Sequence, residues 1–430
     1  MTDTVAYTIP GMHVREHLVD VPLDWSDPAR GTIQLFARDL TAPVRKGEDL
    51  PCLVYLQGGP GGKGPRPLDR SGWLGRALET YRVILVDQRG TGRSTRIDGR
   101  RMSAFATARE GADFLACFRA DSIVADHEHL RKSLYGGGRW SLLGQSYGGF
   151  LTLTYLSRAP EGLSACYVAG GLPGIDPSAA EVYRRTYPRV EAKNEVFYRR
   201  YPQHLAHVAR IADRLSEGEV RLPDGDVLTV RRLQSLGIDF GMKPGHERLH
   251  WLLDEAFNGG ELSSAFLYDV MARTSYSDNP LFSALQESIY GHGAGASAWA
   301  AEVERPRHPQ FAEDARPLQF TGEMIYPWMF REIAQLRPFQ GAVEELAARE
   351  KWPLLYDPDR LAANEVPVAA AVYYDDMYVD AGLQLDTAAR VGNVQTWVTN
   401  EYAHDGIGDA RVFARLMELV QDAGGGITGA

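Results

Sequence analysis

A serine at position 146 stands in the stretch LLGQSYGGF, with glycines on both sides, between an apolar run and a segment with helical apolar spacing. Residues 144–148 fit the pattern G-x-S-x-G, which exposes a nucleophilic serine when it lies between a strand and a helix. A serine hydroxyl is a weak nucleophile near neutral pH. It needs an adjacent base, an acid that orients this base, and donors for the developing oxyanion. We predict that Ser146 is a nucleophile and not merely a small residue in a tight bend.

A second glycine-rich stretch, LQGGPGG at residues 56–62, directly follows an apolar run typical of a strand. Its glycines allow backbone N–H groups to face a reacting carbonyl, whereas Pro60 has no N–H to donate. We therefore predict that the N–H groups of Gly59 and Tyr147 form an oxyanion hole. A phosphate-binding loop is a weaker interpretation, because the stretch lacks the G-K-[ST] ending of a P-loop.

The base and the acid should follow such a serine in the order acid, then histidine. Of the eleven histidines, only His404 lies beyond both a long helical block and a later strand with an acidic end, so it is the predicted base. The orienting acid is expected at the end of that strand, in YYDDMYVD, where Asp375, Asp376 and Asp380 are candidates. Spacing alone does not separate the first two.

The other histidines are expected at the surface, because they lie in charged or helical stretches; among them are His127, His129, His204, His207, His246 and His250. The last two are four residues apart, a spacing that can place two metal ligands on one helix face, but no third ligand lies nearby. No metal site is therefore predicted. The three cysteines lack metal-binding spacing and are expected to be free thiols in a reducing compartment: Cys52, Cys117 and Cys166.

The elements that must position these residues are short apolar runs that alternate with turns and helices. Continuous apolar strands alternating with helices predict an α/β fold, with a mostly parallel sheet covered on both faces. The expected strands are residues 17–25, 31–41, 52–57, 81–90, 139–145, 165–171, 366–376 and 393–400. Helices are expected directly after Ser146 and at residues 409–423.

A helical block interrupts this pattern, because long charged and aromatic stretches replace the strands between about residues 173 and 348. We predict a helical cap at residues 173–348, inserted between core segments at residues 1–172 and 349–430. Such a cap would cover the carboxyl edge of the sheet, where open α/β sheets bind ligands. The glycine-rich tail at residues 424–430 is expected to be disordered.

Composition excludes some classes of function. The 430-residue chain is 44% hydrophobic and 24% charged, as in ordinary globular proteins, and its net charge of -10 argues against a nucleic-acid or anionic-membrane surface. The N-terminus lacks a signal-peptide pattern, and no window approaches eighteen uninterrupted apolar residues. We expect a soluble, unexported, cytoplasmic protein that binds neither nucleic acid nor membrane; the sequence does not indicate an oligomeric state.

Taken together, these motifs resemble the proline iminopeptidase (prolyl aminopeptidase) family of α/β-hydrolases, and especially its longer bacterial branch. The resemblance rests on QGGPGG, VDQRGTGRS, LLGQSYGGF, YYDDMYVD and NEYAHDG, and FTGEMIYPWMF extends it into the predicted cap. It implies that Asp376 is the acid, because this residue immediately precedes MYV. It also implies that Asp87 and Arg89 are a loop-bracing pair. Gln57 departs from the histidine that many relatives have there, which leaves the backbone donors intact.

The resemblance further implies a substrate. The family places glutamates in its cap to bind a free N-terminal amine; Glu323 is the best match and Glu287 the second, with Tyr326, Trp328 and Phe330 placed to pack a pyrrolidine ring. The implied activity is that of a serine aminopeptidase that releases N-terminal residues, preferentially proline, from short peptides through an acyl-enzyme, without a metal or cofactor. An esterase, amidase or lactonase on the same scaffold remains the alternative, because the fold and triad do not determine the acyl group.

Overall fold

The computed structural model describes residues 5–425 and contains a nine-stranded sheet in the order β1-β2-β3-β5-β4-β6-β7-β12-β13. Neighbouring strands are antiparallel from β1 to β5 and parallel from β5 to β13. The predicted α/β fold with a mostly parallel sheet is confirmed. The strands are β1 (Val5–Ile9), β2 (Met12–Pro22), β3 (Thr32–Thr41), β4 (Cys52–Leu56), β5 (Arg82–Asp87), β6 (Trp140–Gln145), β7 (Leu163–Ala169), β12 (Val368–Tyr373) and β13 (Val394–Thr399).

Strand β6 lies between β4 and β7, with Leu56 opposite Gly144 and Gln145 opposite Ala169. The three strands therefore end at the same edge of the sheet. The segments that follow them, at residues 57–62, 146–148 and 170–172, meet at that edge because parallel strands share one carboxyl end.

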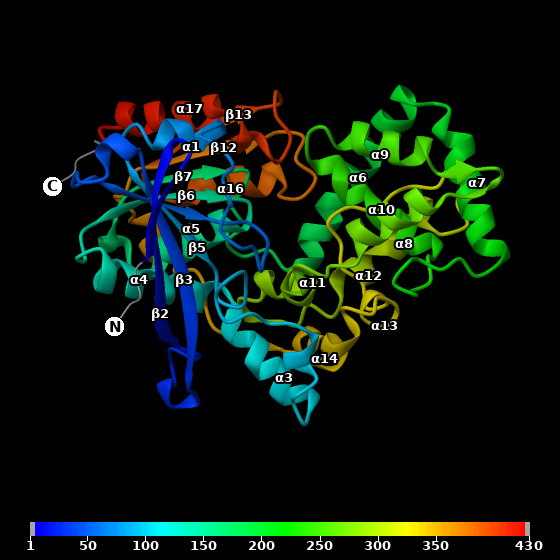
Figure 1. The fold of residues 1–430 in the computed structure, drawn as a ribbon, viewed down its shortest axis with the longest axis horizontal. Helices are drawn as coiled ribbons and strands as arrows, with labels where there is room; N and C mark the ends of the chain where they lie inside the picture. Colours follow the sequence, from blue (N-terminus) through cyan, green and yellow to red (C-terminus); the bar gives the residue numbers. More distant parts are fainter. Residues whose placement is uncertain (1–4, 426–430) are drawn as a thin grey trace.

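Helices cover both faces of the sheet (Figure 1). On one face, α4 (Ala120–Leu134) and α5 (Tyr147–Arg158) pack over an apolar cluster that includes Val54 and Leu142. On the other face, α1 (Gly72–Ala77) and α17 (Ala410–Asp422) cover a second cluster that includes Leu53, Leu143 and Phe413. Successive strand residues enter opposite clusters, which is why these strands are apolar throughout.

A lobe of helices stands beside the sheet and connects β7 to β12 (Figure 1). It includes α6 (Ala179–Arg200), α7 (His204–Glu217), α8 (Val230–Gln234), α9 (Gly245–Asp254), α10 (Ser264–Thr274), α11 (Pro280–Leu285), α12 (Ala300–Glu304), α13 (Met329–Glu332) and α14 (Gln340–Ala347). Two small ladders lie in this part of the chain: β8 (Phe257–Asn258) with β9 (Glu261–Leu262), and β10 (Gly293–Ala294) with β11 (Lys351–Trp352).

The lobe is tied to the sheet by α3 (Ala108–Leu115), a helix from the first third of the chain that packs against α14 (Figure 1). Arg349 forms an ion pair with Asp113, and Arg109 lies 3.8 Å from Glu345. The remaining helices, α2 (Gly99–Met102), α15 (Pro358–Ala362) and α16 (Ala381–Arg390), belong to segments flanking the lobe.

The sequence-based expectations fail at the N-terminal edge of the sheet. Strand β1 was not predicted, and β2 begins at Met12 instead of residue 17. Arg15 and Glu16 interrupt the apolar pattern there, but antiparallel pairing with β3 organises this segment. Residues 1–4, and residues 426–430 of the predicted disordered tail, lie outside the described residues.

Three histidines predicted at the surface are buried instead: His17 in β2, His127 in α4 and His204 in α7. The His127 ring bonds to the Ile123 carbonyl within α4, with Nδ1 2.7 Å from the oxygen. His204 Nε2 lies 2.7 Å from His250 Nδ1, and the His204 ring stacks on Phe197. These helices present charged residues to solvent but bury one face, so their charge content alone wrongly predicts that the histidines on them are exposed.

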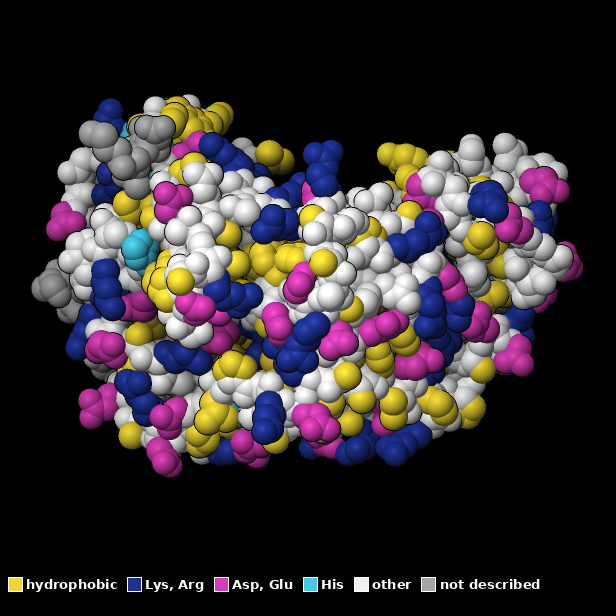
Figure 2. All heavy atoms as spheres, turned by 90° about the horizontal axis from the view of Figure 1, so that it is seen from below, with side chains coloured by type: hydrophobic (Ala, Val, Ile, Leu, Met, Phe, Trp, Pro, Cys, Tyr) yellow, Lys and Arg dark blue, Asp and Glu magenta, His cyan; other side chains and the backbone are white. Residues whose placement is uncertain are grey.

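Acidic and basic side chains are interspersed over the face of the molecule shown in Figure 2. Within residues 5–425, no helix is both long and apolar enough to cross a membrane, and no three His, Cys, Asp or Glu side chains gather as a metal site. The three cysteines are free thiols, and Cys117 and Cys166 are buried.

Candidate active site

Ser146 lies at the junction of β6 and α5 in a strained conformation, with φ 56° and ψ -125°. A positive φ is uncommon for a residue other than glycine, and it persists only where the surroundings hold it. Here the Ser146 N–H donates to the Ala169 carbonyl at 3.1 Å, and the Gly149 N–H donates to the Ser146 carbonyl at 2.8 Å. These bonds hold the serine at a sharp turn between strand and helix.

The glycines on either side allow this turn because no side chain would fit. A Cβ at Gly144 would lie 2.4 Å from the Gly148 carbonyl oxygen. A Cβ at Gly148 would lie 2.0 Å from the Leu56 carbonyl oxygen at the end of β4. The backbones of β4, β6 and α5 therefore touch directly at the serine.

The glycine-rich loop after β4 also approaches the serine. A Cβ at Gly58 would lie 3.1 Å from the Ser146 Cβ, and the next residue, Gly59, has φ 129°. Over residues 5–425, no hydrogen bond is found for the N–H of Gly59 or of Tyr147, the latter being the first residue of α5. Both N–H groups thus remain available to an acceptor beside Ser146.

His404 and Asp376 form a buried pair in which the imidazole Nδ1 lies 2.7 Å from the carboxylate Oδ2. The other oxygen, Oδ1, accepts the N–H groups of Tyr378 at 2.8 Å and Val379 at 3.2 Å. The His404 N–H donates to the Gly241 carbonyl at 2.9 Å, which fixes the histidine loop against the lobe. Both members of the pair are therefore held in place by the backbone.

The other two acidic candidates lie elsewhere. Asp375 is exposed. Asp380 accepts the N–H of Leu383 in the first turn of α16 and binds Arg189. Of the three carboxylates that the sequence left open, Asp376 is the one bonded to His404.

The end of β7 brings this pair to the serine. A Cβ at Gly170 would lie 3.4 Å from Asp376 Oδ2, and a Cβ at Gly171 would lie 2.3 Å from the Ser146 carbonyl oxygen. Asp376 already occupies Nδ1 of His404, so Nε2 is the ring atom left for the serine. Burial would lower the pKa of His404, but the charge and hydrogen bond of Asp376, followed by the charge of Glu323, raise the pKa above its ordinary value.

Glu323 lies near the pair but is not bonded to it. Burial raises the pKa of its carboxyl group to about 7, while His404 lowers this pKa and Asp376 raises it. The nearby Gln286 side chain also lowers this pKa. Burial, and then the Glu323 charge, hold the pKa of Tyr290 and of Tyr378 well above the ordinary value. Glu323 as a residue is half-buried and keeps some solvent-accessible surface near the Asp376–His404 pair.

Comparison with known proteins identifies the family. Residues 51–211 match a model described as the alpha/beta hydrolase fold. The chain is 46% identical over 426 residues to a proline iminopeptidase of Aeromonas sobria, covering 98% of this chain and 100% of the relative. It is 35% identical over 437 residues to a proline iminopeptidase of Aspergillus aculeatus, covering 98% and 97%. The chain belongs to the proline iminopeptidase family. The resemblance inferred from the sequence motifs is confirmed.

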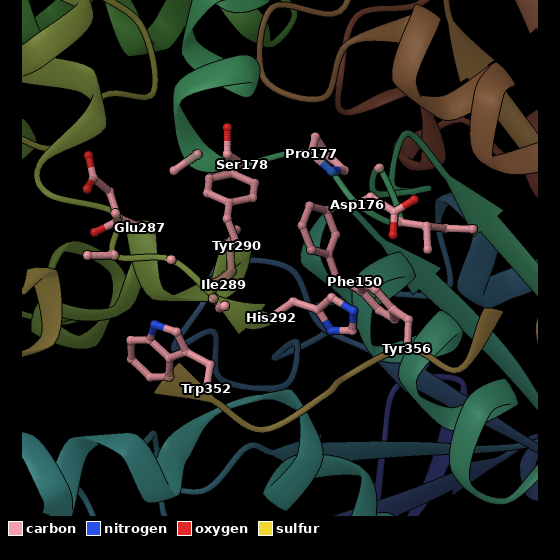
Figure 3. Close-up of a pocket in the computed structure, with 18 residues that line it drawn as sticks. Phe150, Asp176, Pro177, Ser178, Glu287, Ile289, Tyr290, His292, Trp352 and Tyr356 are labelled. Atoms are coloured by element: carbon pink, nitrogen blue, oxygen red, sulfur yellow. The ribbon is translucent and has the colours of Figure 1, made fainter. Parts of the chain in front are cut away.

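The second cap glutamate that this family suggests, Glu287, is occupied by backbone donors. Its carboxylate accepts the N–H of Ala300 at 3.1 Å and of Ala301 at 3.0 Å, in the first turn of α12. Burial raises the pKa of Glu287 to about 7 against these hydrogen bonds. It borders a cavity of about 120 Å³ between lobe and sheet, where Figure 3 shows Tyr290 standing between Glu287 and Phe150. Contact between Glu287 and substrate stays a prediction.

The aromatic residues expected around the substrate pack within the lobe. The Tyr326 hydroxyl lies 2.9 Å from the Tyr187 hydroxyl, and the Tyr326 and Trp328 rings stack with centroids 6.2 Å apart. Arg231 lies over Trp328 at 5.2 Å. Phe330 is buried as well. These rings brace the segment that presents Glu323, and their direct contact with substrate stays a prediction.

Two features beside the site differ from expectation. Asp87 and Arg89 do not bind each other: Asp87 pairs with Arg66, whereas Arg89 binds Asp126, with Nε 2.7 Å from Oδ2. Each braces a separate loop, so their prediction as a pair is wrong. Tyr378 was not expected at the site, yet its ring packs against His404 at 4.7 Å. The sequence signal that could have identified Tyr378 is its position in the MYV segment directly after Asp376.

Proposed function

We propose that this protein is a serine aminopeptidase that releases N-terminal residues, preferentially proline, from short peptides. The observation that carries the proposal is the buried Asp376–His404 hydrogen bond beside the strained turn at Ser146. The proposal is also supported by a relative named proline iminopeptidase, to which the chain is 46% identical over 98% of its length.

In the proposed reaction, the Ser146 Oγ attacks the carbonyl carbon of the N-terminal residue while Nε2 of His404 takes the hydroxyl proton. Asp376 accepts from the Nδ1–H and stabilises the imidazolium. The oxyanion accepts from the N–H groups of Gly59 and Tyr147, and one such donor lowers the barrier by about 3 kcal/mol. His404 then protonates the departing amine, and water repeats the sequence on the acyl-enzyme.

Glu323 is the proposed partner of the substrate's ammonium group. A cation beside this carboxylate favours its ionised form, which burial otherwise disfavours. Charge complementarity in a partly dry site then distinguishes a free N-terminus from an acylated one. In this proposal residues 173–348 act as a cap that restricts access to short peptides.

We also infer a cytoplasmic location. Free thiols at Cys52, Cys117 and Cys166 fit a reducing compartment.

The decisive experiment compares kcat/KM for proline 4-nitroanilide with kcat/KM for its N-acetyl derivative, with 4-nitrophenyl acetate as a control. We expect cleavage of the free amine, loss of most activity on acetylation, and a fall of roughly 10⁶ in turnover for Ser146→Ala. If both anilides resist while the ester is hydrolysed, the esterase alternative replaces the peptidase. If Ser146→Ala retains near wild-type rates, the assignment of the nucleophile is wrong.

A further inference from the structure

Lys193 faces the loop that carries the candidate catalytic acid. It follows Arg189 by four residues on α6, so the two side chains share one face of the helix. Arg189 reaches from the lobe to the core, with Nε 2.6 Å from Asp380 Oδ2 and a guanidinium N–H donating to the Tyr374 carbonyl at 2.8 Å. This face of α6 therefore lies against the segment at residues 374–380.

The backbone around Lys193 is held from the other side as well. The Lys193 carbonyl lies 3.2 Å from His246 Nε2. The next residue, Asn194, makes two hydrogen bonds to the backbone of Phe320, at 2.9 and 2.8 Å, three residues before Glu323. Lys193 thus occupies a defined place between the Asp376 loop and the segment that presents Glu323.

Among the described residues, no group pairs with its ammonium, unlike the cations beside it. Lys243 donates its backbone N–H to Asp405 at 3.0 Å and its Nζ to the Glu401 carbonyl at 2.5 Å. Arg189 is bound as described above. Across residues 5–425, the structure shows neither a hydrogen bond nor an ion pair for the Lys193 Nζ.

The charges around this ammonium group do not neutralise it. Burial lowers the pKa of Lys193, and the nearby Asp375 and Asp376 raise it without cancelling that effect. Lys193 is half-buried, and its Nζ keeps some solvent-accessible surface from which an anion can approach. Within residues 5–425, the structure therefore presents an unpaired, accessible cation near Asp376.

We propose that Lys193 binds the C-terminal carboxylate of a di- or tripeptide substrate. This inference rests on the proposed aminopeptidase function. His404 is the group that would protonate the departing amine, so the peptide beyond the scissile bond extends on the histidine side of the site. Residues 241–243 border this side, because the His404 N–H donates to the Gly241 carbonyl, and Lys243 is a charged neighbour of Lys193.

Peptide length decides whether the contact can form. A chain spans at most about 3.5 Å per residue, so the carboxylate of a di- or tripeptide stays within about 4 to 8 Å of the scissile bond. The flexible stem of a lysine can follow a carboxylate over this range. Longer peptides carry their terminal carboxylate past Lys193. Glu323 and Lys193 would then match the two charges of a short zwitterionic peptide.

The test compares kcat/KM for Pro-Ala and for Pro-Ala amide within each of four proteins: wild type, Lys193→Met, Lys193→Arg and Arg199→Gln. Arg199 is an exposed cation on the same helix and controls for loss of charge at a distance. Because the ratio of the two substrates is taken within one protein, a general loss of activity or of folded protein cancels.

We expect the wild type to favour the free acid by roughly 10-fold, Lys193→Met to bring the ratio close to one, and Lys193→Arg to retain most of the preference. Arg199→Gln should keep the wild-type ratio. A wild type without preference, or a Lys193→Met ratio equal to that of the wild type, overturns the inference. Proline 4-nitroanilide, which lacks a carboxylate, separates the two proposals. If wild type cleaves it while the dipeptide ratio does not depend on Lys193, only this inference fails; if wild type cleaves neither anilide nor dipeptide, the function and the inference fail together.

Discussion

Replacing Glu323 with glutamine should separate recognition of the free amine from acyl transfer. The substitution keeps the size of the side chain and removes its charge. We expect kcat/KM for proline 4-nitroanilide to fall far more than kcat/KM for its carbocyclic analogue, in which cyclopentane replaces the charged pyrrolidine ring. The ratio between the two substrates is therefore the quantity to measure.

The magnitude follows from the surroundings of Glu323. Two unit charges about 4 Å apart attract by about 4 kcal/mol at an effective dielectric constant of about 20. Burial raises the pKa of Glu323 to about 7, so at an assay pH of about 8 most of the carboxyl groups are already ionised and little of this energy is lost to deprotonation. Desolvation of the substrate amine removes more, which leaves about 2 to 3 kcal/mol. At about 1.36 kcal/mol per factor of ten, the ratio should fall roughly 30- to 160-fold.

The assay should be run near pH 8, where Glu323 is mostly ionised. Glu302→Gln is the matched control, because Glu302 is an exposed carboxylate on α12 and should keep the wild-type ratio. A folded Glu323→Gln protein, checked by circular dichroism, whose ratio falls less than about threefold would refute the reasoning. If Glu287→Gln lowers the ratio instead, the amine binds to Glu287, whose carboxylate accepts the N–H groups of Ala300 and Ala301 in this structure.

Three further predictions test the site and its frame. Asp376→Asn should lower kcat by about 10⁴ by favouring the wrong imidazole tautomer, measured by steady-state kinetics; a loss of less than tenfold would contradict the role of this carboxylate. The logarithm of kcat/KM for proline 4-nitroanilide should fall below about pH 7 with a slope approaching about two. The reason is that acid protonates both His404, whose pKa is raised, and Glu323, whose pKa is about 7. In Glu323→Gln the slope should drop to about one, and an unchanged slope would argue against the joint titration of His404 and Glu323. Gly148→Ala should lower the free energy of unfolding, measured in urea, by about 3 kcal/mol or more, because the new Cβ would lie 2.0 Å from a backbone oxygen. The control Gly47→Ala, whose Cβ would meet nothing within 4 Å, should match wild type. Equal stabilities of the two variants would contradict the close backbone approach at Gly148.

The sheet could be predicted to the extent that each strand is apolar on both faces. Strands β4, β6, β7 and β12 lie in the middle of the sheet, and their continuous apolar runs mark them without any knowledge of their partners. Strand β1 and the start of β2 carry no such run, because this edge is antiparallel and partly exposed. Their pairing depends on residues more distant along the chain, which a local pattern does not contain.

The same distinction divides the site. The turn at Ser146 is encoded within five residues, because the glycines that permit its close contacts flank the serine itself. Chain order was enough to predict His404 as the base. Spacing alone left Asp375 and Asp376 open, and only the family resemblance favoured Asp376; the tertiary structure shows that Asp376 is the carboxylate bonded to His404, 28 positions away. The backbone partners of Glu287, the burial of His204 and the unpaired charge of Lys193 are likewise tertiary, because each depends on which helices of the lobe pack together, and that packing is decided by contacts between distant segments.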